Sequence, residues 1–228
     1  MKKLLILFIT LFTAIPVFSM EVDLTKVGHQ QKYINEIGFR ILNANKIEKR
    51  TNFYYEPNRK TVNAWSRLTD RQITVTQGML AYVDSEDEMA ALLSHEISHS
   101  VDSYEGAFKG YFSPLKYSSL SSKKYETKAD KRAVDYMVKA GYNPVAIIVL
   151  YNKFMSQTRY DYYLTHPLTS RRMATVYEYI YRKYPAYLAN NKYAENIYYQ
   201  NFLLTSQQNR EKLKQSIQTN SKKKIKYN

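Results

Sequence analysis

Two histidines four residues apart constrain this chain more than any other feature of its sequence. His95 and His99 lie in the run Leu92–His99, which reads LLSHEISH. Four residues of an α-helix turn the chain by about 400°, so the two imidazoles project from nearly the same face, one turn apart. Two imidazoles so placed can hold one metal ion, and Glu96 beside them can act as general base toward a water in an open coordination position. The run therefore predicts a metal-binding helix.

The residues before the motif also indicate a helix. Ser85 and Glu88 form a Ser-x-x-Glu capping box, whose hydroxyl and carboxylate satisfy backbone donors at a helix start. An apolar stripe at helical spacing follows, made of Met89, Leu92, Leu93 and Ile97. The alternative is that the five-residue motif fell by chance on an ordinary helix with exposed histidines. The chain contains only four histidines, and two of them form the motif, so we favour the metal site.

A third protein ligand has to come from another segment, and Glu126 is the best candidate. It begins a stretch in which apolar residues recur at three- and four-residue steps until Gly141: Ala129, Ala133, Val134, Met137 and Val138. Glu126 and Asp130 lie one turn apart on the helix that this pattern predicts. If that helix meets the first, Glu126 can bind the metal while Asp130 accepts a hydrogen bond from a ligating imidazole. The alternative is a solvated pair of carboxylates among neighbouring lysines.

Four blocks of the sequence resemble the zinc metallopeptidases of family 48, which include the HtpX heat-shock protease and the CAAX prenyl protease. The blocks are Asn63–Trp65 with Ile73–Leu80, Ser85–His99, Glu126–Pro144, and Thr165–Pro167 with Arg172. They follow the family's order and span roughly residues 30 to 180. The resemblance implies that His95, His99 and Glu126 bind one zinc ion per chain. It also implies that Glu96 is the general base, with Asp130 and Arg172 around the ligands.

The resemblance also implies roles for residues farther from the motif. In the family, the histidine that corresponds to His166 lies close to the metal, where it either binds the ion at rest or donates a hydrogen bond to the oxyanion. A turn histidine is the alternative for His166. We expect an extended peptide substrate to bind along Asn63 and Ala64 and to pair with the strand that contains Ile73 and Val75. The short stretch between the two predicted helices departs from many soluble members and bears on substrate preference.

The amino-terminal residues predict the compartment. Lys2 and Lys3 precede an apolar run from Leu4 to Phe18, which is the pattern of a secretory signal peptide cleaved after Ser19 or close by. The run is short for a bilayer span, which takes about 20 residues. We therefore expect export across the inner membrane to the periplasm. An uncleaved amino-terminal anchor is the alternative.

Charge and composition bound the domain organisation and the partners. We expect a signal peptide at 1–19, one metallopeptidase domain at 20–209 and a basic, flexible tail at 210–228. The tail has seven basic residues and one acidic residue, a net charge of +6 out of +14 for the chain. An anionic envelope surface suits this tail, and a solvated tail without a partner is the alternative. No nucleic-acid partner is expected, because the sequence has no recognisable reading helix or aromatic-basic RNA motif.

The expected fold class is α+β: a mostly helical, zincin-like metallopeptidase domain with a small β-sheet and the metal held between two helices. The expected function is zinc-dependent endopeptidase activity on misfolded or unassembled envelope proteins. Two alternatives compete with it. One is a metal-binding chaperone or assembly factor on the same fold, with latent proteolysis. The other is a basic surface-binding protein in which the helix pair is structural.

Overall fold

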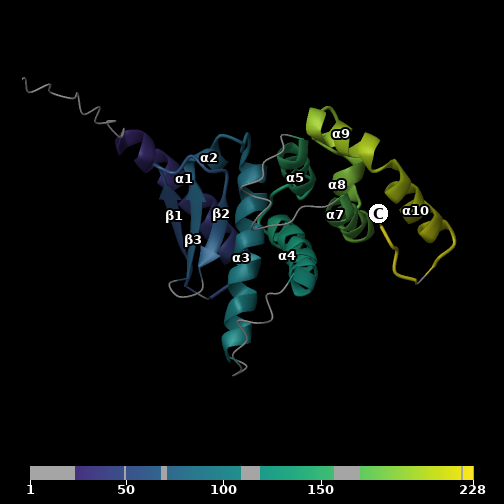
Figure 1. The fold of residues 1–228 in the computed structure, drawn as a ribbon, viewed down its shortest axis with the longest axis horizontal. Coiled ribbons are helices and arrows are strands. Elements are labelled where there is room, and N and C mark those ends of the chain that lie inside the picture. The colour runs from purple at the N-terminus through teal and green to yellow at the C-terminus, as the bar shows by residue number, and fades with distance from the viewer. Residues whose placement is uncertain are drawn as a thin grey trace, which may run out of the picture.

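The computed structural model describes residues 24–48, 50–67, 71–108, 119–156, 170–221 and 223–227 (Figure 1). Its longer helices are α1 (Leu24–Ala44), α3 (Glu86–Phe108), α4 (Ser119–Lys139), α5 (Ala146–Ser156), α7 (Ser170–Lys183), α9 (Ile197–Thr205) and α10 (Gln207–Gln218). Two single-turn helices are α2 (Gln77–Leu80) and α8 (Ala186–Ala189), and the strands are β1 (Asn52–Glu56), β2 (Ala64–Arg67) and β3 (Gln72–Thr76). The predicted α+β class, mostly helical with a small sheet, is confirmed.

The three strands form one mixed sheet in the order β1-β3-β2. β1 runs parallel to β3, with Tyr54 opposite Thr74, and β2 runs antiparallel to β3, with Trp65 opposite the same threonine. Since β3 lies in the middle, its backbone is paired on both sides. Four of its five side chains are also buried, and those of Ile73 and Val75 are completely so.

Helix α1 covers the sheet at β1 and also packs against α3. Its buried face consists of Ile34, Ile37, Ile41 and Leu42, at the spacing that one side of a helix requires. The approach to β1 is close at Gly38. A Cβ atom there would lie 2.4–2.7 Å from ring carbons of the buried Phe53, so this contact needs a residue without a side chain.

The start of α3 is fixed by the two residues of the predicted capping box, although the return bond from Glu88 goes to the N–H of Asp84, one residue before the expected donor. The Ser85 hydroxyl accepts a hydrogen bond from the Glu88 backbone N–H at 3.2 Å, and the Glu88 carboxylate accepts one from the Asp84 N–H at 3.2 Å. The Lys153 ammonium on α5 binds the same Glu88 oxygen at 2.7 Å. The carboxylate therefore ties α5 to the beginning of α3.

Helix α4 lies along α3. It begins at Ser119, seven residues before the predicted start at Glu126, and its last residue is Lys139, two before the Gly141 at which the sequence predicts the end. Gly141 has a φ of +80°, and the Tyr142 N–H returns to the Met137 carbonyl at 2.9 Å. This is the bond of a Schellman motif, for which glycine is suited because it lacks a Cβ. In Figure 1, α3 stands between the sheet on one side and α4 and α5 on the other.

The carboxyl-terminal helices lie on the far side of α5 from the sheet (Figure 1). α10 covers Gln207–Gln218, with Leu213 buried, so the first part of the segment expected to be a flexible tail is helical. The chain then returns to α7, where the Arg171 Nε donates to the Tyr227 carbonyl at 3.0 Å and the Tyr227 hydroxyl donates to Glu178 at 2.9 Å. The expected signal peptide, residues 1–19, lies outside the described residues. Within them, every helix is too short or too polar to cross a bilayer.

Candidate metal centre

His95 and His99 project from one face of α3, as their spacing predicts. Their Nε2 atoms lie 3.0 Å apart and their rings are nearly perpendicular, with an interplanar angle of 86°. The His95 side chain is 1% exposed and that of His99 is 20% exposed. The first imidazole is therefore enclosed by the protein, while the second lies at the accessible side of the site.

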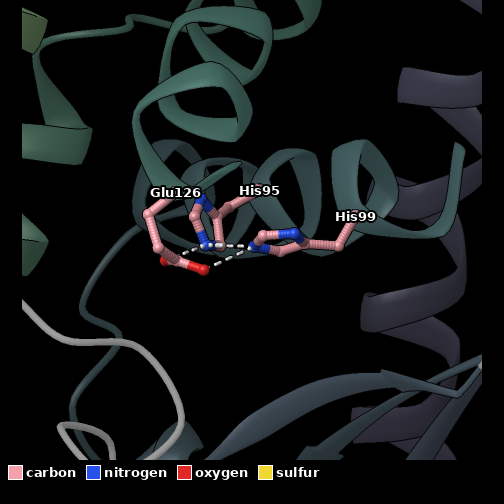
Figure 2. A group of neighbouring side chains, drawn as sticks. All are labelled: His95, His99 and Glu126. Atoms are coloured by element: carbon pink, nitrogen blue, oxygen red, sulfur yellow. Dashed lines mark hydrogen bonds and ion pairs between the residues drawn. The ribbon is translucent and has the colours of Figure 1, made fainter. Parts of the chain in front are cut away.

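Glu126 reaches the same point from α4. One of its carboxylate oxygens lies 3.4 Å from the His95 Nε2 and the other lies 3.2 Å from the His99 Nε2. Figure 2 shows the three side chains converging, two from α3 and one from α4. One ligand atom from each of the three lies within 4.8 Å of the other two. The residues that the sequence singled out as ligands are therefore neighbours in space.

These separations fit a small tetrahedral cation. Zinc binds imidazole nitrogen and carboxylate oxygen at about 2.0–2.2 Å, so two donors on one tetrahedral ion lie about 3.3 Å apart. The two imidazole nitrogens are 3.0 Å apart, and each lies 3.2–3.4 Å from a different oxygen of Glu126, so these separations bracket that value. Nitrogen and carboxylate donors are also the ligand types that zinc takes in catalytic sites. The residues present therefore fit a zinc ion.

Asp130 and Arg172 lie directly behind the ligands. An Asp130 carboxylate oxygen lies 3.1 Å from the Nδ1 of His95, the ring nitrogen on the side away from Glu126. From α7, the Arg172 Nε and Nη2 donate to the two oxygens of Asp130 at 2.8 and 2.7 Å. The Arg172 Nη1 lies 2.9 Å from Glu126. One buried guanidinium therefore neutralises part of the charge of two buried carboxylates.

The contacts between these groups set their protonation. Burial alone would raise the pKa of the Glu126 carboxyl, but hydrogen bonds from the two histidines and the charge of Arg172 hold it well below its ordinary value. Burial would also raise the pKa of Asp130, and Arg172 and His95 lower it instead. For His95, burial lowers the pKa, but the two carboxylates outweigh that effect and raise it to about 9. The site is therefore built to hold positive charge between ionised carboxylates.

Glu96 lies next to His95 on α3 and is 1% exposed. Its role as general base, which the sequence predicts from the position beside the two imidazoles, stays a prediction. His166, together with Thr165 and Pro167, lies outside the described residues, so its predicted place near the metal stays a prediction.

One residue that contacts the ligands was missed by the sequence reasoning. Tyr151 on α5 is not among the predicted site residues, yet its hydroxyl lies 3.1 Å from the Nδ1 of His95 and donates to Asp130 at 2.8 Å. It is fully buried. Tyr151 is 56 residues from His95 in the chain, so no local spacing pattern connects the two.

The expected peptide-binding strand has to be corrected. Ile73 and Val75 lie on β3, whose backbone hydrogen-bonding groups are used by β1 and β2, so β3 cannot accept an additional strand. Of the outer strands, β2 is the one that packs against α3, the helix that carries His95 and His99. Ala64 begins β2, and Asn63 precedes it and accepts a hydrogen bond from the Thr76 N–H at 3.2 Å. The Asn63–Ala64 segment therefore leads into the outer strand nearest to α3.

A His-Glu-x-x-His helix joined by a glutamate from a second helix, beside a small mixed sheet, defines the metallopeptidase class. The chain belongs to peptidase family M48, whose family model matches residues 28–106 and 106–180. The family resemblance noted in the sequence is thus confirmed.

Several curated proteins are similar to this chain. The beta-barrel assembly-enhancing protease of Escherichia coli K12 is 22% identical over 183 residues, which cover 63% of this chain and 37% of that protein. The protein of the same name from Yersinia pestis is 24% identical over the same extent. The chain thus spans a little over a third of the length of these relatives.

Proposed function

We propose that the protein is a zinc-dependent endopeptidase, with His95, His99 and Glu126 as the zinc ligands. The observation that carries this proposal is the convergence of two imidazoles from α3 and one carboxylate from α4, whose nitrogen and oxygen atoms lie 3.0–3.4 Å apart where they face one another. The charges of the site support it as well. Two carboxylates share one guanidinium, so the contacts leave one negative charge beside two imidazoles, without counting Glu96.

Each residue of the site has a separate role in the proposed peptide hydrolysis. A bound zinc ion supplies Lewis acidity, which polarises a carbonyl and makes a bound water acidic near neutral pH. Glu96 takes the proton of the attacking water and passes it to the leaving amine. Asp130, whose carboxylate is bound by Arg172, keeps the His95 ring in place by accepting a hydrogen bond from the Nδ1 of that ring. We assign stabilisation of the developing oxyanion to His166, as the family resemblance implies.

The outer edge of β2 is the place that we propose for the substrate. An extended peptide can add to an exposed sheet edge through main-chain hydrogen bonds. Packing of β2 against α3 would bring such a peptide close to the ligand helix. In this proposal Asn63 and Ala64 position the substrate, whereas Ile73 and Val75 lie on the neighbouring strand β3 and support β2 from the core.

For substrates and compartment, we propose misfolded or unassembled envelope proteins in the periplasm. The relatives are named for enhancing β-barrel assembly, and the amino-terminal sequence has the pattern of an export signal. Cleavage of the signal is tested by the amino-terminal sequence of the protein recovered from cell fractions. An intact Lys2–Phe18 segment in a membrane fraction would favour the anchored alternative.

The decisive experiment measures metal content and proteolysis on the same samples. Mass spectrometry should find about one zinc per chain, with less in His95→Ala and Glu126→Ala. Unfolded casein should be cleaved by the wild type and spared by Glu96→Gln, which should keep its zinc. Zinc without cleavage would favour the chaperone with latent proteolysis. A folded wild type that takes up no zinc would contradict the proposed function.

A further inference from the structure

The hydroxyl of Tyr151 lies at the centre of the groups behind the metal ligands. It donates to an Asp130 oxygen at 2.8 Å, receives a hydrogen bond from Arg172 Nη2 at 3.3 Å and lies 3.1 Å from the His95 Nδ1. The ring is also fixed from two sides. The His95 ring meets it edge to face at a centroid distance of 6.1 Å, and the Arg172 guanidinium carbon lies 5.1 Å from its centre.

The hydrogen bonds around this hydroxyl determine which ring nitrogen of His95 carries a proton. A phenol has one proton, and Tyr151 gives it to the Asp130 carboxylate, which when ionised can only accept. A guanidinium can only donate, so Arg172 uses one lone pair of the phenol oxygen. The remaining lone pair faces the His95 Nδ1, so a hydrogen bond there requires that this nitrogen carries the proton.

The same requirement comes from the carboxylate. An Asp130 oxygen also lies 3.1 Å from the His95 Nδ1, so both acceptors demand an N–H at this position. In a neutral imidazole with Nδ1 protonated, Nε2 keeps its lone pair. The Nε2 of His95 is the atom that lies beside Glu126 and His99.

We propose that Tyr151 is a positioning residue that holds His95 as the Nδ1–H tautomer and fixes the ring, so that the Nε2 lone pair points at the metal. The inference rests on the proposed zinc site and extends it to a fourth helix, α5. Tyr151 acts through His95 and Asp130 and does not touch the ion or the substrate. Because Asp130 remains as a second acceptor for the Nδ1 proton, loss of the Tyr151 hydroxyl weakens the site without abolishing it.

Tyr151→Phe is the direct test, because it removes the hydroxyl and keeps the buried ring. The matched control is Tyr193→Phe. The Tyr193 hydroxyl is also buried and also donates to a carboxylate, that of Asp87, at 3.0 Å. Asp87 lies eight residues before His95 on α3, about 12 Å along the helix axis. Both variants therefore lose the same kind of bond, but only one loses it at the metal ligands.

Zinc affinity is measured by competition with a chromophoric chelator at one fixed pH, and the absorption spectrum of the cobalt(II) form is recorded for each protein. We expect Tyr151→Phe to bind zinc about tenfold more weakly, as for other residues that support metal ligands. Its cobalt spectrum should also change. Tyr193→Phe should keep the wild-type affinity and spectrum, although thermal unfolding should show both variants to be less stable than the wild type.

The outcomes separate this inference from the proposed function. A wild type that binds zinc no differently from Tyr151→Phe, with identical cobalt spectra, overturns the role of Tyr151 and leaves the zinc site intact. A wild type that binds no zinc overturns both. If Tyr151→Phe fails to fold, the inference can still be tested on the wild type. Nitrogen-15 NMR of the zinc-loaded wild type should show His95 protonated at Nδ1, and an unprotonated Nδ1 contradicts the inference.

Discussion

Arg172 on α7 donates two parallel hydrogen bonds to Asp130 on α4, from Nε and Nη2 to the two carboxylate oxygens, at 2.8 and 2.7 Å. Both side chains are buried. The geometry is the bidentate pairing that a planar guanidinium allows and that a lysine cannot reproduce. Through its Nη1, the same arginine also reaches Glu126 at 2.9 Å. The pair therefore joins α7 to the ligand-bearing helix.

Arg172→Gln should destabilise the protein by about 3–5 kcal/mol, because it leaves two buried carboxylates without their cation. Chemical denaturation of the metal-free variant and wild type measures this loss. Arg182→Gln is the control, since Arg182 is partly exposed and pairs with Glu178 at the surface of the same helix. That change should cost less than about 1 kcal/mol. Equal losses in the two variants would contradict the structural role of the Arg172 pair.

The metal-free protein should lose stability as the pH rises through the titration of His95. The pKa of His95 is raised from 6.5 to about 9, so its stabilising contribution is fully present below pH 6.5 and disappears as the pH rises through 9. The loss amounts to at most about 3 kcal/mol. Over the same interval zinc should bind more tightly, because the competing proton leaves. Denaturation curves of chelator-treated protein test this, and His95→Gln should remove the dependence.

Lys153→Met should lower stability by about 3 kcal/mol without changing zinc affinity. The Lys153 ammonium is buried and contacts Asp84 and Glu88, each at 2.7 Å, and its loss leaves the buried Glu88 carboxylate unpaired. The network lies at the start of α3, where Glu88 stands seven residues before His95, so the metal site should persist. Lys183→Met, which breaks a half-exposed pair with Asp135, serves as the control. Weakened zinc binding in Lys153→Met would show that the start of α3 governs the ligands.

Gly38→Ala and Gly28→Ala should have opposite effects, although both lie on α1. A Cβ at Gly38 would clash with the ring of Phe53, and overpacking of this kind costs about 1–3 kcal/mol. A Cβ at Gly28 meets no atom within 4 Å, and alanine is the better helix former by up to about 1 kcal/mol. Thermal unfolding of the two variants decides the matter. A stabilised Gly38→Ala would contradict the close approach of α1 to β1.

Local patterns in the sequence predicted the parts of the site that lie within one helix. His95 and His99 share a face because they are four residues apart, and the chain turns away from α4 at Gly141 because the positive φ needed there suits glycine. The strand order was not predictable in this way. The pattern of β3 indicates a buried strand, but whether a strand is central or outer depends on partners elsewhere in the chain.

The same limit explains Tyr151 and the end of the chain. A buried tyrosine on an apolar helix face has the same sequence pattern whether its hydroxyl contacts a histidine or a backbone carbonyl. The contact between Tyr151 and His95 arises only from the packing of α5 against α3. The composition of residues 210–228 indicates a solvated tail. In the structure Leu213 is buried and α10 packs against α7. The net charge of the segment gives no information about such contacts.

The position of Arg172 in the chain has a consequence during synthesis. The two histidines and Glu126 are made first, and the arginine follows His95 by 77 residues. Until α7 has emerged from the ribosome and docked, Glu126 and Asp130 lack the cation that allows both to be buried as ions. A growing chain therefore holds the complete zinc-binding motif well before it can hold the finished site. The order of the residues thus delays assembly of the site until α7 has been synthesised.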